Sequence, residues 1–293
     1  MSKISKVIIP VAGLGTRMLP ATKAIPKEML PIAGKPLIQY IVEEIKQAGF
    51  REIILITHSS KSSIEDHFDT SFELEATLDK RIKRSILKEI KNISKLGITF
   101  QSIRQGEAKG LGHAILMASE VLKEEPFAIV LPDMLIQSLG KGKNLALMKK
   151  SFDKNNISSI LLAPALKKDI PKYGIAKIKE NKNRHQIGYL DSIIEKPSIK
   201  NAPSNLFASG RYIFTHEIMN FLKNNNPDKN NEIQLTSAID SFLKSGHEVI
   251  GYRLEGKVHD CGNKIGYSIA NFEYSKIDPE IGSSFKKYIK KNV

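Results

Sequence analysis

Two cations flank a glycine-rich stretch near the start of the chain. Gly13 and Gly15 follow the apolar run 6–12, which is short enough to form a buried parallel strand. Glycine at the end of a strand lets backbone N–H groups approach an anion closely, because no Cβ intervenes and a positive φ is allowed. Arg17 and Lys27 place two positive charges beside this loop. The sequence therefore predicts a cradle for a polyphosphate.

The loop differs from two common nucleotide-binding fingerprints. A dinucleotide-binding GxGxxG loop needs a third glycine at the position of Met18, and no window reads GxxxxGK followed by Ser or Thr. A glycine-rich turn that only closes a βα unit is the simpler alternative. The two cations favour a functional loop, and Pro20, Pro26 and Pro31 would hold it in place because proline fixes φ.

Two aspartates are candidate ligands of Mg²⁺. Asp133 follows the apolar strand expected at 127–131, and a carboxylate at the carboxyl end of a strand would face bound phosphates. Asp260 lies far downstream, just before Gly262, and could instead be a turn residue. Mg²⁺ usually takes one or two protein carboxylates together with substrate oxygens, so two aspartates suffice chemically. Whether the two meet in space does not follow from the sequence.

Two further loops carry groups that suit a nucleotide base and a sugar phosphate. The loop 105–113 contains small residues that let a flat ring lie against the backbone, and Gln105 offers an amide donor and acceptor for the edge of a base. Glu195 and Lys196 close a strand; the carboxylate can accept hydroxyl hydrogen bonds, and the ammonium can pair with phosphate. Each pattern alone is also typical of an ordinary solvated loop.

Strand-like and helical patterns alternate through the first half of the chain. Strands are expected at 6–12, 52–57, 98–103 and 127–131, with a helix over about 36–48 that ends at Gly49. This βαβ repetition predicts an α/β fold with a Rossmann-like, doubly wound, mostly parallel central sheet. Shorter β-like runs follow at 158–163, 173–179, 187–194 and 207–214, and helices are expected at 236–244 and 264–276.

No internal repeat or linker divides the chain, so we expect a single domain over 1–293. Its nucleotide-binding half would be 1–156, its sugar-phosphate-binding half 157–262, and 263–293 a C-terminal helical extension. The densely charged segment 62–95 predicts a solvated helical hairpin, with an oligomer contact as the alternative.

The composition is that of an ordinary globular protein, with 41% hydrophobic and 26% charged residues. No apolar run approaches the roughly 20 residues of a membrane span, and the start of the chain lacks the apolar region of a signal peptide. A single cysteine, Cys261, excludes an internal disulfide and fits a reducing compartment. We therefore expect a cytoplasmic protein without a membrane partner.

The formal net charge of +14 raises the question of nucleic-acid binding. The excess lysines are scattered over the chain rather than gathered in a stripe with interleaved aromatic residues, which is typical of solvated faces. The sequence therefore predicts no nucleic-acid partner, although the charge could draw anionic small substrates towards the protein.

Taken in order, these segments resemble the sugar-1-phosphate nucleotidyltransferases, and most closely the bacterial UTP–glucose-1-phosphate uridylyltransferases. The motifs that carry the resemblance lie at 13–31, 55–61, 104–106, 109–113, 131–133, 195–197, 210–212, 232–236 and 260–264. The first motif is specific to the superfamily, whereas 26–30 and 260–264 indicate the uridylyl branch. The resemblance covers essentially the whole chain, and its one soft departure is Ser209, where a residue such as valine is expected.

The resemblance implies a role for each candidate residue. Ala12 and Gly13 would contact uracil through their backbone, with Gly15 in the same nucleotide-binding loop, Gln105 and Gly110 closing the pocket and Glu28 nearby. Arg17 would hold the β- and γ-phosphates, Lys27 would neutralise the α-phosphate, and Asp133 and Asp260 would bind Mg²⁺ as the cofactor. Gly174, Glu195 and Gly210 would hold glucose, and Lys196 would hold its phosphate.

The implied reaction transfers UMP from UTP to glucose 1-phosphate and yields UDP-glucose and pyrophosphate. Attack would be in line, assisted by Mg²⁺ and without a covalent enzyme intermediate, so Cys261 would be structural. A dTTP- or other-sugar-1-phosphate nucleotidyltransferase on the same scaffold and a non-catalytic nucleotide-binding regulatory module remain alternatives. Members of the family often form dimers or tetramers, so we also expect a homodimer or homotetramer.

Overall fold

The computed structural model describes residues 4–138, 140, 142–180 and 185–292. In sheet order, the first four strands of the central sheet are β5 (Thr99–Arg104), β4 (Glu52–Thr57), β1 (Lys6–Pro10) and β6 (Phe127–Val130). All three pairings among them are parallel. The strands and the parallel arrangement expected in the first half are thus confirmed, with boundaries that shift by one or two residues.

Apolar side chains leave strand β1 on both faces of the sheet. Val7 and Ile9 join a core cluster with the apolar face of helix α1 (Leu37–Gln47), whereas Ile8 joins a second cluster with helix α5 (Gly110–Leu116). A strand covered by helices on both sides reads as a continuous apolar run, which is why β1 was recognisable in the sequence.

The second half of the chain continues the sheet with strands of mixed direction. These are β11 (Leu206–Phe214), β8 (Ser158–Pro164), β12 (Val249–Arg253), β10 (Gln186–Glu195) and β9 (Gly174–Glu180), and they complete a nine-stranded sheet within the described residues. β11 runs antiparallel to both β6 and β8, and β10 runs antiparallel to β9 and β12. β9 also pairs with β11, so this part of the sheet closes partly on itself.

The expectation of a mostly parallel sheet is therefore wrong for this half. Parallel neighbours need a long crossover, usually a helix, whereas antiparallel neighbours can follow one another through a short connection. The strands β8 to β11 follow one another without an intervening α-helix, and the consecutive strands β9 and β10 form an antiparallel pair, whereas β11 pairs antiparallel with the more distant β6 and β8.

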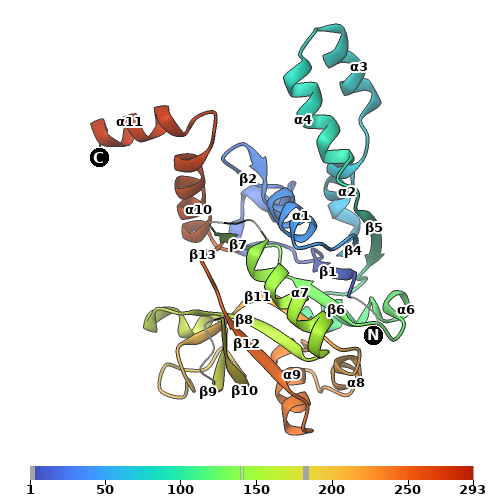
Figure 1. The fold of residues 1–293 in the computed structure, drawn as a ribbon, viewed down its shortest axis with the longest axis vertical. Coiled ribbons are helices and arrows are strands. Elements are labelled where there is room, and N and C mark those ends of the chain that lie inside the picture. The colour runs from blue at the N-terminus through green and yellow to red at the C-terminus, as the bar shows by residue number, and fades with distance from the viewer. Residues whose placement is uncertain (1–3, 139, 141, 181–184, 293) are drawn as a thin grey trace.

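The remaining elements surround the sheet (Figure 1). They include the short strands β2 (Pro31–Ile32), β3 (Lys35–Pro36), β7 (Met134–Gln137) and β13 (Lys257–Asp260), and the 3-10 turns η1 (Thr16–Met18), η2 (Ala21–Lys23), η3 (Lys27–Met29), η4 (Ser59–Lys61) and η5 (Lys167–Lys172). The other helices are α2 (Ser62–Phe68), α3 (Phe72–Lys80), α4 (Arg84–Ser94), α6 (Ser119–Leu122), α7 (Lys143–Asn155), α8 (Ile218–Lys223), α9 (Leu235–Lys244), α10 (Lys264–Ile277) and α11 (Gly282–Asn292).

Two groups of helices project from the body of the molecule (Figure 1). The segment 62–95 forms three helices rather than a simple hairpin, and α3 and α4 extend away from the sheet. At the other end of the chain, α11 projects sideways from the end of α10. No helix in the described residues has the length and apolarity needed to cross a membrane.

A buried ion pair joins the second half of the sheet to helix α1. The guanidinium of Arg211, which is fully buried on β11, donates from Nε and Nη2 to the two carboxylate oxygens of Glu44 at 2.9 and 2.7 Å. Nη1 donates to the backbone carbonyl of Leu131 at 3.4 Å, two residues before Asp133. The pair therefore helps to hold the segment that carries this aspartate.

We predict that Arg211→Met lowers the free energy of unfolding by about 3–5 kcal/mol, because it leaves the Glu44 carboxylate buried without its cation. Combining it with Glu44→Leu should recover a large part of the loss. Lys143→Met is the control, because Lys143 pairs with Glu255 at 2.6 Å on an exposed surface and its loss should change the free energy by less than about 1 kcal/mol. Chemical denaturation measures all three. Equal losses in the two single variants would contradict the prediction.

Candidate active site

The order of the parallel strands places a crevice at the end of β1. The chain runs from β1 to β4 and β5 on one side, whereas β6 lies on the other side of β1. The connections that follow β1 and β6 therefore run in opposite directions and leave a gap between them. In open α/β sheets, ligands bind at such a gap, beyond the carboxyl ends of the strands. The glycine loop follows β1, and Asp133 follows β6.

Gly15 folds the glycine loop back on itself. Its φ is +68°, in the left-handed region that favours glycine, and an added methyl group would lie 3.3 Å from Thr22 Cγ2 and 3.4 Å from Lys27 Cβ. The Thr22 hydroxyl donates to the Gly15 carbonyl at 2.8 Å. The close approach brings η3, and with it Lys27, beside the glycine loop.

A cavity of about 480 Å³ lies against this loop. Most of the residues expected to bind nucleotide line it, together with both cations and one aspartate: Ala12, Gly13, Gly15, Arg17, Lys27, Gln105, Gly110 and Asp133. Gly110 has a φ of +89°, and a methyl group there would lie 2.8 Å from Glu232 Cβ, so the position needs glycine. The Gln105 amide nitrogen lies 2.8 Å from His113 Nδ1, which orients this amide at the cavity wall.

A second cavity of about 510 Å³ adjoins the first. Its lining includes Arg17 and Asp133 again, together with the expected sugar-site residues Gly174, Glu195 and Lys196 and the second aspartate, Asp260. Arg17 and Asp133 thus lie where the two cavities meet. Two spaces of similar volume that share charged residues can hold two substrates next to each other.

Three residues of this second cavity are positioned by one another. A methyl group at Gly174 would lie 2.7 Å from Thr236 Cγ2, and the Thr236 hydroxyl donates to Glu195 Oε2 at 3.1 Å. Lys196 has a φ of +45°, its backbone N–H donates to the Tyr173 carbonyl at 3.0 Å, and its Nζ lies 3.3 Å from Glu195 Oε1. The exposed ammonium therefore lies at the rim, beside the carboxylate.

The two aspartates meet because β7 and β13 form an antiparallel ribbon. Asp260 pairs with Met134 in that ribbon, and the Cys261 N–H donates to the Asp133 carbonyl at 2.8 Å. A methyl group at Gly262 would lie 2.8 Å from Asp133 Oδ2, 3.0 Å from Asp260 Oδ1 and 2.9 Å from Arg17 Nη2. Two carboxylate oxygens and one guanidinium nitrogen thus converge on one small space that only glycine leaves open.

The two carboxylates are ligands of the kind that a hard cation such as Mg²⁺ prefers, since Mg²⁺ binds oxygen and keeps several positions for water or phosphate. No group of three or more histidine, cysteine, aspartate or glutamate side chains suited to a metal occurs in the part of the chain that the structure describes. The donor set is therefore two aspartates, and substrate oxygens would have to complete it.

Lys27 pairs directly with one of these aspartates. Its Nζ lies 2.7 Å from Asp133 Oδ2. Burial alone would raise the pKa of Asp133, but the charge and hydrogen bond of Lys27 hold that pKa below its ordinary value. Burial alone would also lower the pKa of Lys27, but Asp133 raises it above its ordinary value. Both side chains are therefore charged at neutral pH.

Tyr173 contacts the other aspartate, and sequence reasoning had assigned it no role. Its hydroxyl donates to Asp260 Oδ2 at 3.1 Å, and its ring stacks on Phe207. Burial and the neighbouring Asp260 charge raise the pKa of Tyr173, so the hydroxyl keeps its proton and remains a donor. Thr236 and Gly262 lie inside motifs that carry the family resemblance, but they too had been assigned no role. The feature of the sequence that could have identified Tyr173 was its position next to Gly174, an expected site residue.

Two expected site residues, Glu28 and Gly210, lie outside the described linings of both cavities. Glu28 is fully buried, and its Oε2 accepts from Lys61 Nζ at 2.9 Å. Gly210 has a φ of +82°, and its carbonyl accepts from the Leu131 N–H at 2.9 Å. Both residues thus support the walls of the site from behind.

Cys261 is buried, and burial together with the nearby aspartates raises the pKa of its thiol. A protonated, inaccessible thiol is a poor nucleophile, which agrees with the structural role expected from the sequence. Ser209, the departure from the expected pattern, is also buried, and its hydroxyl donates to the Leu161 carbonyl at 3.0 Å. The extra polar group is therefore satisfied without changing the site.

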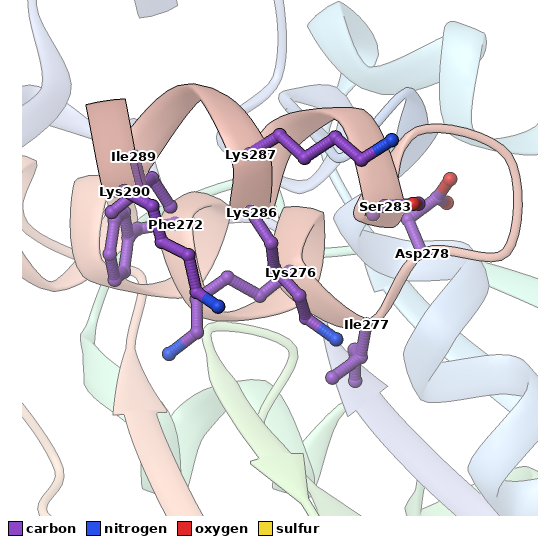
Figure 2. A pocket seen from close by; sticks show the side chains of 10 residues that line it. Phe272, Lys276, Ile277, Asp278, Ser283, Lys286, Lys287, Ile289 and Lys290 are labelled. Atoms are coloured by element: carbon purple, nitrogen blue, oxygen red, sulfur yellow. The ribbon is translucent and has the colours of Figure 1, made fainter. Parts of the chain in front are cut away.

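A further cavity of about 590 Å³ lies apart from these loops, between α10 and α11 (Figure 2). Lysine side chains surround it together with apolar ones: Lys276, Lys286, Lys287, Lys290, Phe272, Ile277 and Ile289. None of the candidate site residues lines it, so it is no part of the arrangement above.

We predict that Gly262→Ala weakens Mn²⁺ binding in the presence of a nucleoside triphosphate by about 10- to 100-fold, because the methyl group displaces the ends of three side chains in the metal space. Electron paramagnetic resonance of free Mn²⁺ measures the affinity. Gly106→Ala is the matched control, because Gly106 is exposed and an added methyl group would contact nothing within 4 Å. A Gly262→Ala variant with unchanged affinity would remove this space from the site.

Comparison with known proteins adds an independent line of argument. The Nucleotidyl transferase family matches residues 6–276 of this chain. A UTP–glucose-1-phosphate uridylyltransferase from Haemophilus ducreyi is 50% identical over 289 residues, which cover 97% of this chain and 98% of that protein.

Two solved structures share the fold. The UTP-bound UGPase from Acinetobacter baumannii has a TM-score of 0.91 at 40% identity, covering 99% of this chain and 100% of that one. A UDP-glucose pyrophosphorylase complexed with UDP-glucose has a TM-score of 0.84 at 40% identity, covering 94% of this chain and 99% of that one. The α/β fold described above is therefore that of these enzymes.

Proposed function

The chain belongs to the nucleotidyl transferase family, and from this premise we propose how its two cavities work together. Its activity is that of a UTP–glucose-1-phosphate uridylyltransferase, which produces UDP-glucose. The observation that carries the proposal is that the two cavities meet at Arg17 and Asp133, with Lys27 paired to Asp133 at 2.7 Å. A triphosphate in the first cavity and a sugar phosphate in the second would meet at these charges.

We assign the first cavity to UTP. Ala12 and Gly13 would contact the uracil through their backbone, with Gln105 and Gly110 on the opposite wall. Arg17 would bind the β- and γ-phosphates, and Lys27 the α-phosphate. Glu28 would act from behind, because it is buried against Lys61 and its neighbour in sequence is Lys27.

We assign the second cavity to glucose 1-phosphate. Glu195, held by the Thr236 hydroxyl, would accept hydrogen bonds from the sugar, and Gly174 leaves room for the Thr236 side chain that holds it. Lys196 would bind the phosphate. Gly210 would act indirectly, because it lets β11 approach the segment 131–134.

Positioning and charge neutralisation then account for the chemistry. The phosphate of glucose 1-phosphate is already ionised at neutral pH, so its oxygen can attack the α-phosphorus in line without a general base. Lys27 and Lys196 would neutralise charge on the transferring and attacking phosphates, and Arg17 would hold the leaving pyrophosphate.

We further propose Mg²⁺ as the cofactor, held by Asp133 and Asp260. When bound, the metal would supply positive charge to the phosphate oxygens as the bond to pyrophosphate breaks. Tyr173 would hold Asp260 in place, because a second partner fixes the orientation of a ligating carboxylate.

The decisive test is pyrophosphate release with UTP, dTTP, ATP and GTP, each offered with several sugar 1-phosphates. We expect the highest kcat/KM for UTP with glucose 1-phosphate. Preference for dTTP or another sugar phosphate would favour a different transferase on this scaffold, and nucleotide binding without turnover would favour a regulatory module. Either result would overturn the assigned reaction.

We predict that Asp133→Asn lowers kcat/KM by at least about 100-fold while circular dichroism stays unchanged, because charge placed at the reacting phosphates is lost. Asp191→Asn is the matched control, since Asp191 lies on β10 and pairs with Lys177 at 3.0 Å at the protein surface. An Asp133→Asn variant with nearly wild-type rates would exclude Asp133 from the metal site.

We also propose that the chain forms a homodimer or homotetramer through α10 and α11. Support comes from exposed apolar side chains on these helices, among them Ile265, Phe272 and Tyr288, of which Phe272 lines the cavity of Figure 2. Burial of such residues between copies would stabilise an assembly.

Light scattering should therefore give a mass of two or four times 32.7 kDa for the wild type. The variant Phe272→Asp with Tyr288→Asp should shift it towards the monomer. Phe72→Asp on α3 is the control, because Phe72 is even more exposed than Phe272 and Tyr288 but lies on the other projecting group. Dissociation by Phe72→Asp alone would assign the contact to the segment 62–95 instead.

A further inference from the structure

One carboxylate oxygen of Asp133, Oδ2, contacts Lys27 and also faces the space assigned to the metal. Oδ2 accepts from Lys27 Nζ at 2.7 Å, and the same Oδ2 lies 2.8 Å from the methyl position at Gly262, the space assigned to the metal. The positive charge of an ammonium at that distance repels a cation that approaches the same oxygen. The Lys27 ammonium and a divalent cation therefore compete for Oδ2.

The oxygens of Asp260 also have partners within the protein. Oδ1 accepts from the backbone N–H of Gly262 at 2.9 Å, and Oδ2 accepts from the Tyr173 hydroxyl at 3.1 Å. These donors are neutral, so they orient the carboxylate without repelling a cation. The competition at Asp133 is different in kind, because Lys27 carries a full positive charge.

The charges that meet at this point are balanced without a metal. Arg17 and Lys27 contribute two positive charges, and Asp133 and Asp260 contribute two negative ones. A divalent cation entering alone would make the group strongly positive, and Lys27 and Arg17 would repel it. A nucleoside triphosphate brings several negative charges to the same cations, so nucleotide and metal together restore the balance.

The backbone of Lys27 is held in place, whereas its side chain contacts Asp133 and also lines the nucleotide cavity. Its neighbour Glu28 is tied to Lys61 by a buried ion pair of 2.9 Å, which holds the turn η3 against the loop after β4. The Lys27 side chain itself lines the nucleotide cavity. A rotation of this side chain would therefore move the ammonium away from Asp133 within the cavity assigned to the nucleotide.

We propose that Lys27 keeps Asp133 from binding a divalent cation until a nucleoside triphosphate enters, so that this one side chain couples metal binding to nucleotide binding. The proposal rests on the assignment of Asp133 and Asp260 as metal ligands in the proposed function. It adds that Lys27 opposes the metal in the empty site and serves the reaction once its ammonium has moved to the phosphates.

Mn²⁺ binding followed by electron paramagnetic resonance, with and without UTP, tests this coupling. Without UTP, Lys27→Met should bind Mn²⁺ about tenfold more tightly than the wild type. UTP should tighten Mn²⁺ binding strongly in the wild type and less in Lys27→Met. Lys23→Met is the matched control, because it removes the same charge from an exposed position in the same loop and should change the affinity by less than about twofold.

The gain in Lys27→Met must depend on Asp133. Adding Asp133→Asn to Lys27→Met should abolish it; a gain that survives would reflect general charge and overturn the proposal. No gain in Lys27→Met would overturn it as well. Lys27→Gln, which removes the charge but keeps a hydrogen-bond donor, should show a smaller gain and replaces Lys27→Met if that variant fails to fold.

One more variant distinguishes a failure of this proposal from a failure of the proposed function. Asp133→Asn alone, with UTP present, should weaken Mn²⁺ binding about tenfold or more. If it does so but Lys27→Met shows no gain without UTP, the coupling is wrong and the metal site stands. If Asp133→Asn leaves Mn²⁺ binding with UTP unchanged, the metal site itself is wrong.

Discussion

The contact between Lys27 and Asp133 is the interaction on which the site depends. A carboxylate held at the end of a buried strand loses much of its hydration, and it stays ionised there because an ammonium lies 2.7 Å away. The same contact brings the nucleotide loop of the first half against the strand end that faces the sugar cavity. In the proposed function, a phosphate and a divalent cation would take the place of each partner in this pair when substrates enter.

The rest of the fold holds these charged side chains in their positions. The ribbon of β7 and β13 brings Asp260 beside Asp133, and Gly262 leaves the space between them open. Behind the ribbon, Arg211 joins β11 to α1 and to the Leu131 carbonyl. Charged groups in such a site can be both stable and reactive only if buried partners hold the backbone while the exposed side-chain ends remain free to move.

Sequence reasoning succeeded where local patterns were strong. The strands around β1 are continuous apolar runs between covering helices, so they and the loops at their ends were predictable. It failed on strand direction in the second half, because the partners of β11 lie far away along the chain. Glu28, expected near the nucleotide, and Gly210, expected at the sugar, are not among the described residues that line the two cavities, so their roles stay predictions. A motif marks that a position matters without showing which way its side chain points.

By itself, the sequence determined the family, the α/β class and the identity of the charged groups, because glycine, cation and aspartate positions follow short apolar runs and need no long-range information. Only the tertiary structure decided that Asp133 and Asp260 meet, that Tyr173 and Thr236 hold nearby carboxylates, and that Lys27 and Gly262 both approach one oxygen of Asp133. The meeting of the two aspartates depends on the pairing of β7 with β13 across more than a hundred residues, and such pairing is set by packing of the whole molecule rather than by any local pattern.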